Sequence, residues 1–169
     1  MRTIVRVIEW ISEWTGRVIC WACLALVLVL SFEVIMRYVF DAPTIWSYEI
    51  ATMLGCTIII LGLAYTHRHH GHVRVDVFWR LLSPRGQAIA DVICALLLFF
   101  PLVIAIIYIS IWWVGFSISI GEIMTKTYWY PPAWPLRIIF FLGFLLFLLQ
   151  GVSQLVRDLH LAIRNKSYD

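Results

Sequence analysis

The sequence predicts an all-α integral membrane protein with four transmembrane helices, and composition gives the first two reasons. Hydrophobic residues make up 62% of the 169 residues and the mean hydropathy is +0.89, whereas soluble domains contain about 45–50% apolar residues. Charged residues make up only 14% of the chain, against about 25% in soluble domains. A surface with so few charges suits lipid better than water. The third reason is that the apolar residues form four long runs.

Each run is long enough for one transmembrane helix, because roughly 20 apolar residues cross about 30 Å of hydrocarbon. The runs cover residues 18–39, 46–65, 92–116 and 134–156 of a single membrane domain, residues 1–169. All four are expected to be helical, because unpaired backbone groups in lipid are costly. The first run is too long for the core of a signal peptide and lacks a small-residue cleavage site, so we expect it to be retained. Pro101 is expected to kink the third span or to be compensated locally.

The basic residues predict the orientation of the spans, because cytoplasmic connections carry an excess of Lys and Arg. They gather before the first span, between the second and third, and after the fourth: Arg2, Arg6, Arg17, Arg68, Arg74, Arg80, Arg85, Arg157, Arg164 and Lys166. Both termini are therefore expected in the cytoplasm. Apolar residues at helical spacing within 4–11 and 77–82 predict two short interfacial amphipathic helices on the same side.

Glu33 and Arg37 lie four residues apart near the outer end of the first span, so they can form an ion pair on one helix face. An acid inside a span otherwise suggests proton coupling, and small four-helix exporters carry such an acid in their first span. We favour the ion pair near the lipid headgroups because the partner is so close. A small exporter that uses Glu33 stays open as an alternative function.

A histidine-rich segment, residues 67–72, follows the second span. Histidine clusters can bind zinc or copper, but this one contains no acid or cysteine, and Asp76 is the nearest carboxylate. A basic cytoplasmic turn that binds anionic lipid headgroups explains it better. The Cys20 and Cys23 pair has no second pair at metal-ligand spacing, so we expect those side chains to be packing surface.

The membrane anchor of a redox complex is the second alternative, since four spans and several histidines also suit such an anchor. Bis-histidine haem ligation needs histidines at span depth on facing helices, and no apolar run contains one. The sequence also lacks the paired broken helices of a transporter site, a nucleophile with its base, a phosphate loop and a metal motif. The residues therefore predict a non-enzymatic subunit of a larger membrane complex.

Short motifs along the chain add a resemblance to this interpretation. In order, they are Arg37–Pro43 (RYVFDAP), Trp46–Glu49 (WSYE), Gly62, His72–Asp76 (HVRVD), Gly121–Glu122, Trp134–Pro135 and Gln150–Gly151. Over about residues 18–157, the chain resembles the small permease (DctQ-like) subunit of tripartite ATP-independent periplasmic (TRAP) transporters. The Gly–Glu and Trp–Pro motifs are most similar to the branch associated with organic-acid substrates.

The resemblance implies a multi-pass protein of the bacterial inner membrane and a division of labour among three proteins. A periplasmic binding protein delivers the solute, and a large multispan subunit moves it with an ion gradient, usually of Na⁺. The small subunit packs beside the large one as a fixed scaffold and helps to dock the binding protein. No nucleic acid and no cofactor are expected, apart from bound phospholipid. Ten residues are expected at the partner or lipid interface: Glu33, Arg37, Trp46, Glu49, Arg68, His72, Arg74, Asp76, Glu122 and Trp134.

Overall fold

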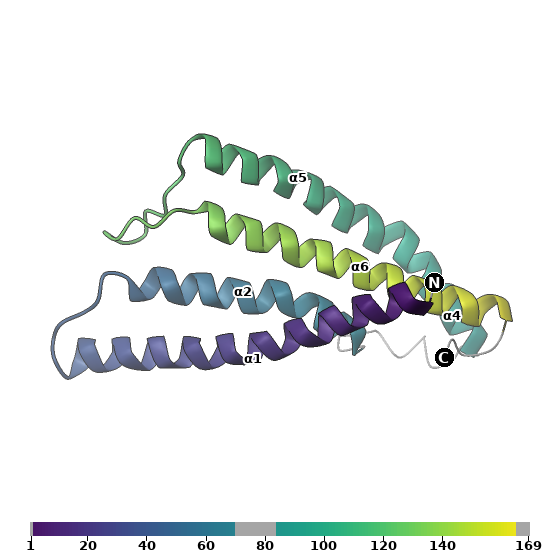
Figure 1. Ribbon diagram of the computed structural model, residues 1–169, viewed down its shortest axis with the longest axis horizontal. Helices are drawn as coiled ribbons and strands as arrows, with labels where there is room; N and C mark the ends of the chain where they lie inside the picture. The colour runs from purple at the N-terminus through teal and green to yellow at the C-terminus, as the bar shows by residue number, and fades with distance from the viewer. Residues whose placement is uncertain (1, 70–83, 165–169) are drawn as a thin grey trace.

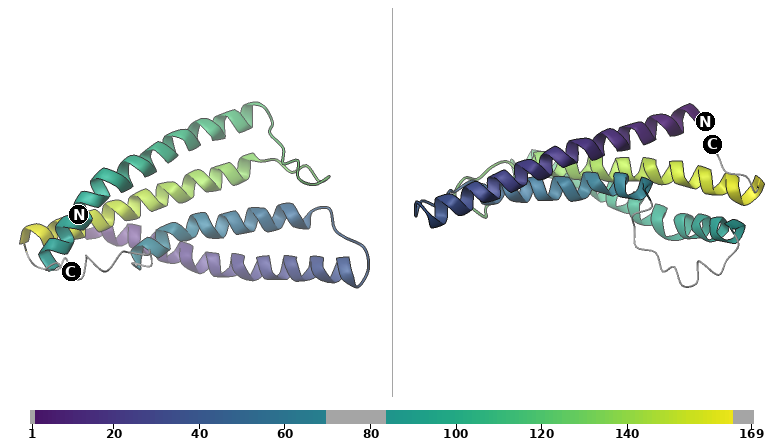
Figure 2. Two further views of the ribbon diagram at one scale, coloured as in Figure 1. Left: turned by 180° about the vertical axis from the view of Figure 1, so that it is seen from behind. Right: turned by 90° about the horizontal axis from the view of Figure 1, so that it is seen from below.

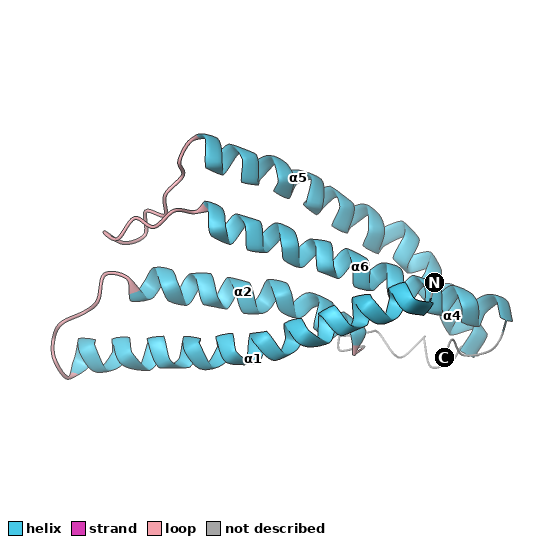
Figure 3. Cartoon of the chain, in the orientation of Figure 1, coloured by secondary structure: helices cyan, strands magenta, loops and turns pink. Residues whose placement is uncertain are grey.

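The computed structural model describes residues 2–69 and 84–164, and almost all of these residues are helical (Figures 1 and 3). The elements are α1 (Arg2–Tyr38), α2 (Ser47–Arg68), α4 (Pro84–Cys94), the π-helical turn η1 (Ala95–Phe99), α5 (Phe100–Ser119) and α6 (Trp134–Arg164). Four helical segments are long and apolar enough to cross a membrane: Trp10–Tyr38, Ser47–Arg68, Gly86–Ser119 and Trp134–His160. The prediction of four transmembrane helices is confirmed.

The N-terminal segment differs from the sequence prediction. Residues 4–11 were expected to form a separate amphipathic helix, but α1 runs without a break from Arg2 to Tyr38. No proline lies between Ile11 and Val18, and adding residues to an existing helix costs far less than starting a new one. The second predicted amphipathic segment, residues 77–82, lies outside the described residues.

Pro101 is accommodated by a local change in the helix. It is the second residue of α5, which begins directly after the five-residue π-helical turn η1. The Phe100 N–H donates to the carbonyl of Ala95, five residues back rather than four. Proline lacks a backbone donor, and a π-turn widens the helix where the regular ladder is interrupted. Gly86–Ser119 therefore continues as one span through the proline.

The four spans lie side by side in the order α1, α2, α6 and α5 (Figure 1). α2 and α6 form the central pair, and α1 and α5 lie at the two edges (Figure 2). The 39–46 and 120–133 connections lie together at one end, which we call the hairpin end. The start of α1 and the end of α6 lie at the other end, which we call the terminal end (Figure 1).

Glycines allow the helices of this layer to approach closely. A methyl group on Gly143 of α6 would lie 2.3 Å from the Ile60 side chain and 3.1 Å from the Ile60 backbone of α2. A methyl group on Gly16 would lie 2.3 Å from the Tyr65 side chain, and one on Gly151 would lie 2.2 Å from the Phe99 side chain. Lipid chains are as apolar as the side chains, so helices in a membrane associate through such close packing and through polar contacts.

Buried polar side chains supplement the glycine contacts. The Ser12 hydroxyl donates to Gln150 Oε1 over 2.9 Å and joins α1 to α6. Many large apolar side chains face outward instead, including Leu28 of α1, Ile59 of α2 and Leu102 of α5, each more than 60% exposed. The layer therefore has little apolar core of its own and offers its apolar surface to lipid or to another protein.

Candidate functional site

Glu33 anchors the connection between α1 and α2. Its Oε1 accepts hydrogen bonds from Arg37 Nε over 3.1 Å and from Arg37 Nη2 over 2.5 Å. Its Oε2 accepts from the Thr44 N–H over 3.1 Å and from the Thr44 hydroxyl. The predicted ion pair is present, and both carboxylate oxygens are used to hold the chain's own loop. This arrangement gives Glu33 a structural role and weakens the exporter alternative.

Trp46 attaches the same connection to the first helix. Its ring stacks on Phe32 of α1 with 5.9 Å between the centroids. The following residue, Ser47, is 3% exposed, and Asp41 has a left-handed backbone with φ of 49°. Aspartate tolerates this conformation better than most residues, because its short polar side chain can form local hydrogen bonds. The turn is thus fixed at several points along its length.

Glu49, in the first turn of α2, joins the α1–α2 hairpin to the α5–α6 hairpin. The side chain is fully buried, and its Oε1 accepts from the N–H groups of Lys126 and Thr127 over 3.2 and 3.1 Å. In the described residues Glu49 Oε2 has no hydrogen-bond partner. Sequence analysis placed Glu49 at the outer end of its span but could not identify Lys126 and Thr127 as partners, because they lie more than 70 positions away in the chain.

Glu122 and Arg137 form an ion pair that closes the connection between α5 and α6. The guanidinium of Arg137 also lies 4.7 Å from the centroid of the Trp113 ring, a geometry that favours cation–π attraction. The hydrogen bond from Arg137 is the largest of the effects that hold the pKa of the Glu122 carboxyl below its ordinary value, and it outweighs the burial that raises it. Glu122 is therefore ionised at neutral pH.

The backbone of this connection folds back on itself. The Ala133 N–H donates to the Glu122 carbonyl over 2.9 Å, and the Met124 N–H donates to the Pro131 carbonyl over 2.8 Å. Gly121 begins the turn with φ of +62°, a conformation that glycine adopts without strain. These bonds hold the segment between Glu122 and Ala133 as a compact loop whose tip is bound to α2 through Glu49.

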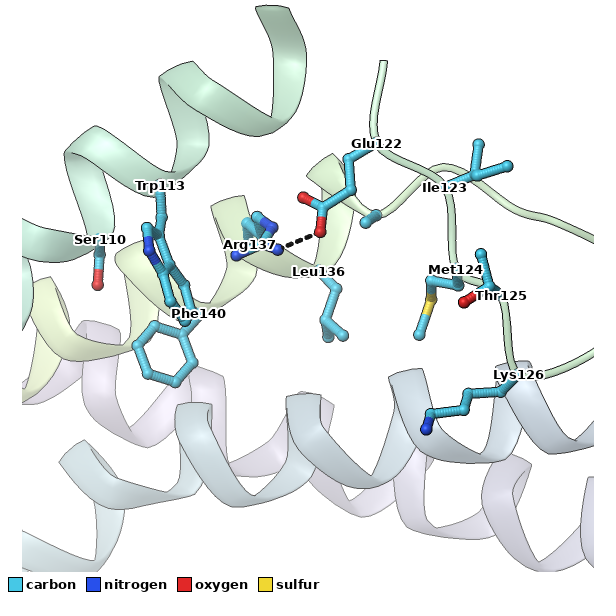
Figure 4. Close-up of a pocket in the computed structure, with 11 residues that line it drawn as sticks. Ser110, Trp113, Glu122, Ile123, Met124, Thr125, Lys126, Leu136, Arg137 and Phe140 are labelled. Atoms are coloured by element: carbon cyan, nitrogen blue, oxygen red, sulfur yellow. Dashed lines mark hydrogen bonds and ion pairs between the residues drawn. The ribbon is translucent and has the colours of Figure 1, made fainter. Parts of the chain in front are cut away.

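A cavity of about 350 Å³ lies between this loop and helices α5 and α6 (Figure 4). Its walls are mostly apolar, and the polar groups include the Glu122–Arg137 pair and Lys126. Figure 4 shows Lys126 at one end and Trp113, Phe140 and Ser110 at the other. Trp134, which the sequence placed at an interface, is 43% exposed at the start of α6.

Arg68, one of the basic residues predicted to bind lipid headgroups, lies at the terminal end. Arg68 forms an ion pair with Glu13 of α1 over 2.8 Å, and His69 Nε2 lies 3.5 Å from the same carboxylate. His67 does not belong to an exposed turn, because its ring packs against two phenylalanines. The centroid of the His67 ring lies 5.2 Å from that of Phe99 and 5.3 Å from that of Phe147. His72, Arg74 and Asp76 lie outside the described residues, so their lipid contact stays a prediction.

Among residues 2–69 and 84–164, no three His, Cys, Asp or Glu side chains come together as a set that could hold a metal ion. Cys20 and Cys23 are exposed on the surface of α1 as free thiols. The charged groups of the described chain lie toward the two ends of the layer, where several of them hold loops and helix ends.

Two comparisons with known proteins agree with this architecture. A family model described as the DctQ component of tripartite ATP-independent periplasmic transporters matches residues 26–161. The sialic acid TRAP transporter permease protein SiaT of Haemophilus influenzae (strain 86-028NP) is 27% identical over 95 residues, which are 56% of this chain. The chain spans 15% of the length of that relative. It therefore belongs to the DctQ component family, as a small multi-pass subunit of a TRAP transporter in the bacterial inner membrane.

Proposed function

We propose that this chain is a non-catalytic scaffold that supports a large, ion-coupled permease subunit during uptake of an organic acid. A periplasmic binding protein delivers the solute, and the large subunit carries the transport pathway. The layer formed by α1, α2, α6 and α5 stays fixed while a domain of the large subunit moves beside it. Both termini and the histidine-rich segment face the cytoplasm, and the hairpin end faces the periplasm.

The observation that carries the proposal is the distribution of charge along the four spans. The middle of each span contains no charged residue, and the stretches without charge lie between Arg17 and Glu33, Glu49 and His67, Asp91 and Glu122, and Arg137 and Arg157. A polar solute or ion crossing the membrane needs polar partners near the midplane. The acids at the hairpin end bind the chain's own loops instead, so the layer is built to support another protein.

The open arrangement of the helices supports the same conclusion. A self-sufficient bundle buries its apolar side chains between its own helices, whereas here Leu28, Ile59 and Leu102 are exposed. The family description names a component of a tripartite transporter, which supports a second membrane protein as the partner of this exposed surface. The relative in Haemophilus influenzae is named for sialic acid, which is itself an organic acid, so a carboxylate solute fits this proposal.

Reconstitution into liposomes tests the proposal. Vesicles would contain this chain alone, the large subunit alone, or both, and each would be assayed with the binding protein, a Na⁺ gradient and a panel of radiolabelled carboxylates that includes sialic acid. We expect uptake only when both membrane subunits and the binding protein are present. Uptake driven by this chain without the large subunit would contradict a scaffold role.

A further inference from the structure

The cavity at the hairpin end has the shape and polarity of a site for an amphiphile. Its volume of about 350 Å³ lies in the range of roughly 300–1,000 Å³ that is usual for small-molecule sites. Helices α5 and α6 form its walls, and the folded-back loop between Glu122 and Ala133 forms its cover (Figure 4). The loop is held by Glu49 and by the Glu122–Arg137 pair, so the cavity does not depend on a ligand for its form.

The lining changes from polar to apolar along the membrane normal. Lys126 and Thr125 belong to the loop, outside the helix ends. Phe140 lies about 9 Å inside the start of α6, and Trp113 lies about 9 Å inside the end of α5, at about 1.5 Å of rise per residue. A phospholipid has the same order, with a phosphate at the headgroup level and acyl chains toward the middle of the bilayer.

The charge at the polar end suits a phosphate. Lys126 and Arg137 contribute two positive charges and Glu122 one negative charge, which leaves an excess of one positive charge among the charged lining residues. Lys126 is exposed, and its ammonium group has no ion-pair partner within the described residues. Basic residues beside an apolar surface at the headgroup level bind lipid phosphates.

We propose that this cavity binds one phospholipid from the leaflet at the hairpin end. The phosphate pairs with Lys126, and an acyl chain lies against Leu136, Phe140 and Trp113. This site lies at the opposite end of the layer from His67 and His69, at the end of α2. A bound lipid fills the space beneath the loop that Glu49 and Glu122 hold in place.

Native mass spectrometry of the full-length protein tests this site. The protein would be placed in nanodiscs of phosphatidylethanolamine and phosphatidylglycerol, released into mild detergent and scored for retained phospholipid. We expect one tightly retained lipid in the unmodified chain. Leu136→Trp, which fills the cavity, should lower retention about tenfold, and Lys126→Ala, which removes the free cation, should lower it about fivefold.

A matched control separates the cavity from the general lipid surface. Leu142→Trp adds the same side chain to α6 at a position that is 45% exposed and outside the cavity, so retention should not change. Equal retention in Leu136→Trp and Leu142→Trp would overturn the proposal. Lys126 is an exposed loop residue whose replacement preserves the fold, so unchanged retention in Lys126→Ala would overturn the phosphate contact even if Leu136→Trp failed to fold.

Two further arms identify the ligand. Inorganic phosphate added to the detergent solution should not displace the lipid, because it lacks the acyl chain; displacement of lipid by phosphate alone would show an anion site instead. The same measurement on the co-purified complex with the large subunit should give the same retained lipid. Loss of the lipid from that complex would show that a protein segment occupies the cavity. That result would contradict the proposed lipid site.

Discussion

The hairpin end and the middle of the helix layer are held together in different ways. At the hairpin end, Glu33, Glu49 and Glu122 accept hydrogen bonds from loop backbone or from arginine and fix the connections. Between the hairpins and the termini, Gly143 and Gly151 let α6 approach α2 and η1 closely. In lipid the hydrophobic effect adds little between helices, so charged contacts position the loops and close packing positions the helices.

The largest effect is expected where a carboxylate joins the two hairpins. Glu49→Ala removes the acceptor for the Lys126 and Thr127 amides, and we expect a loss of about 3 kcal/mol in the free energy of unfolding, because hydrogen bonds to charged groups contribute about 1.5–3 kcal/mol each. Hydrogen–deuterium exchange at these two amides, together with thermal unfolding in mild detergent, measures the change. Glu49→Gln keeps an acceptor and should lose less. Unchanged protection of both amides in Glu49→Ala would show that Glu49 does not hold the loop.

The glycine contacts are expected to give the next largest effect. In Gly143→Ala the new methyl group would lie 2.3 Å from the Ile60 side chain and 3.1 Å from its backbone, which should cost about 1–3 kcal/mol of overpacking. Gly62→Ala is the matched control, since a methyl group there has nothing within 4 Å. Thermal unfolding of both variants tests the comparison, and equal stability of the two would mean that α2 and α6 are not closely packed at Gly143.

A smaller loss of stability is expected in the connection between α1 and α2, because several hydrogen bonds to Glu33 hold it. Thr44→Val removes the hydroxyl that donates to Glu33 and leaves the Thr44 N–H bond in place. We expect a loss of about 1 kcal/mol, the usual net value of one hydrogen bond. Thr44→Ser retains a hydroxyl and should behave like the unmodified protein in thermal unfolding. A loss in Thr44→Ser as large as that in Thr44→Val would show that the hydroxyl bond to Glu33 is not what distinguishes the two variants.

The smallest effect is expected from acidification at the second hairpin. The folded state lowers the pKa of Glu122, so its ion pair adds stability that is complete above the ordinary glutamate pKa of about 4.3 and is lost as pH falls through the lower folded value. Hydrogen exchange in residues 120–133, corrected for intrinsic rates, should stay constant from neutral pH to about pH 5. It should rise only in stronger acid. Glu122→Gln should abolish this acid dependence, and its persistence there would point to another group.

Much of the fold could be predicted because the relevant information is local. The spans follow from runs of apolar residues, and the Glu33–Arg37 pair follows from a spacing of four on one helix. The order of the helices in the layer and the contact from Glu49 to Lys126 depend on residues far apart in the chain. The spacing of apolar residues along the chain does not indicate which distant residues come into contact.

Other features could be predicted only in part. The sequence indicated that Pro101 needs compensation, but the π-turn that provides it lies before the proline. Glu122 and Arg137 were separate features in the sequence, and the turn at Gly121 brings them together. His67 was grouped with the histidines after it, whereas its packing against Phe99 and Phe147 depends on tertiary structure.

The most direct test of the scaffold proposal is whether the layer keeps its shape during transport. Spin labels at Leu28 of α1 and Leu142 of α6, both exposed, would be introduced after replacement of the four native cysteines. Electron–electron double resonance would then measure their separation in the complete transporter, with and without Na⁺ and loaded binding protein. We predict one distance distribution under all conditions. A second distance that grows when solute is added would contradict a fixed scaffold.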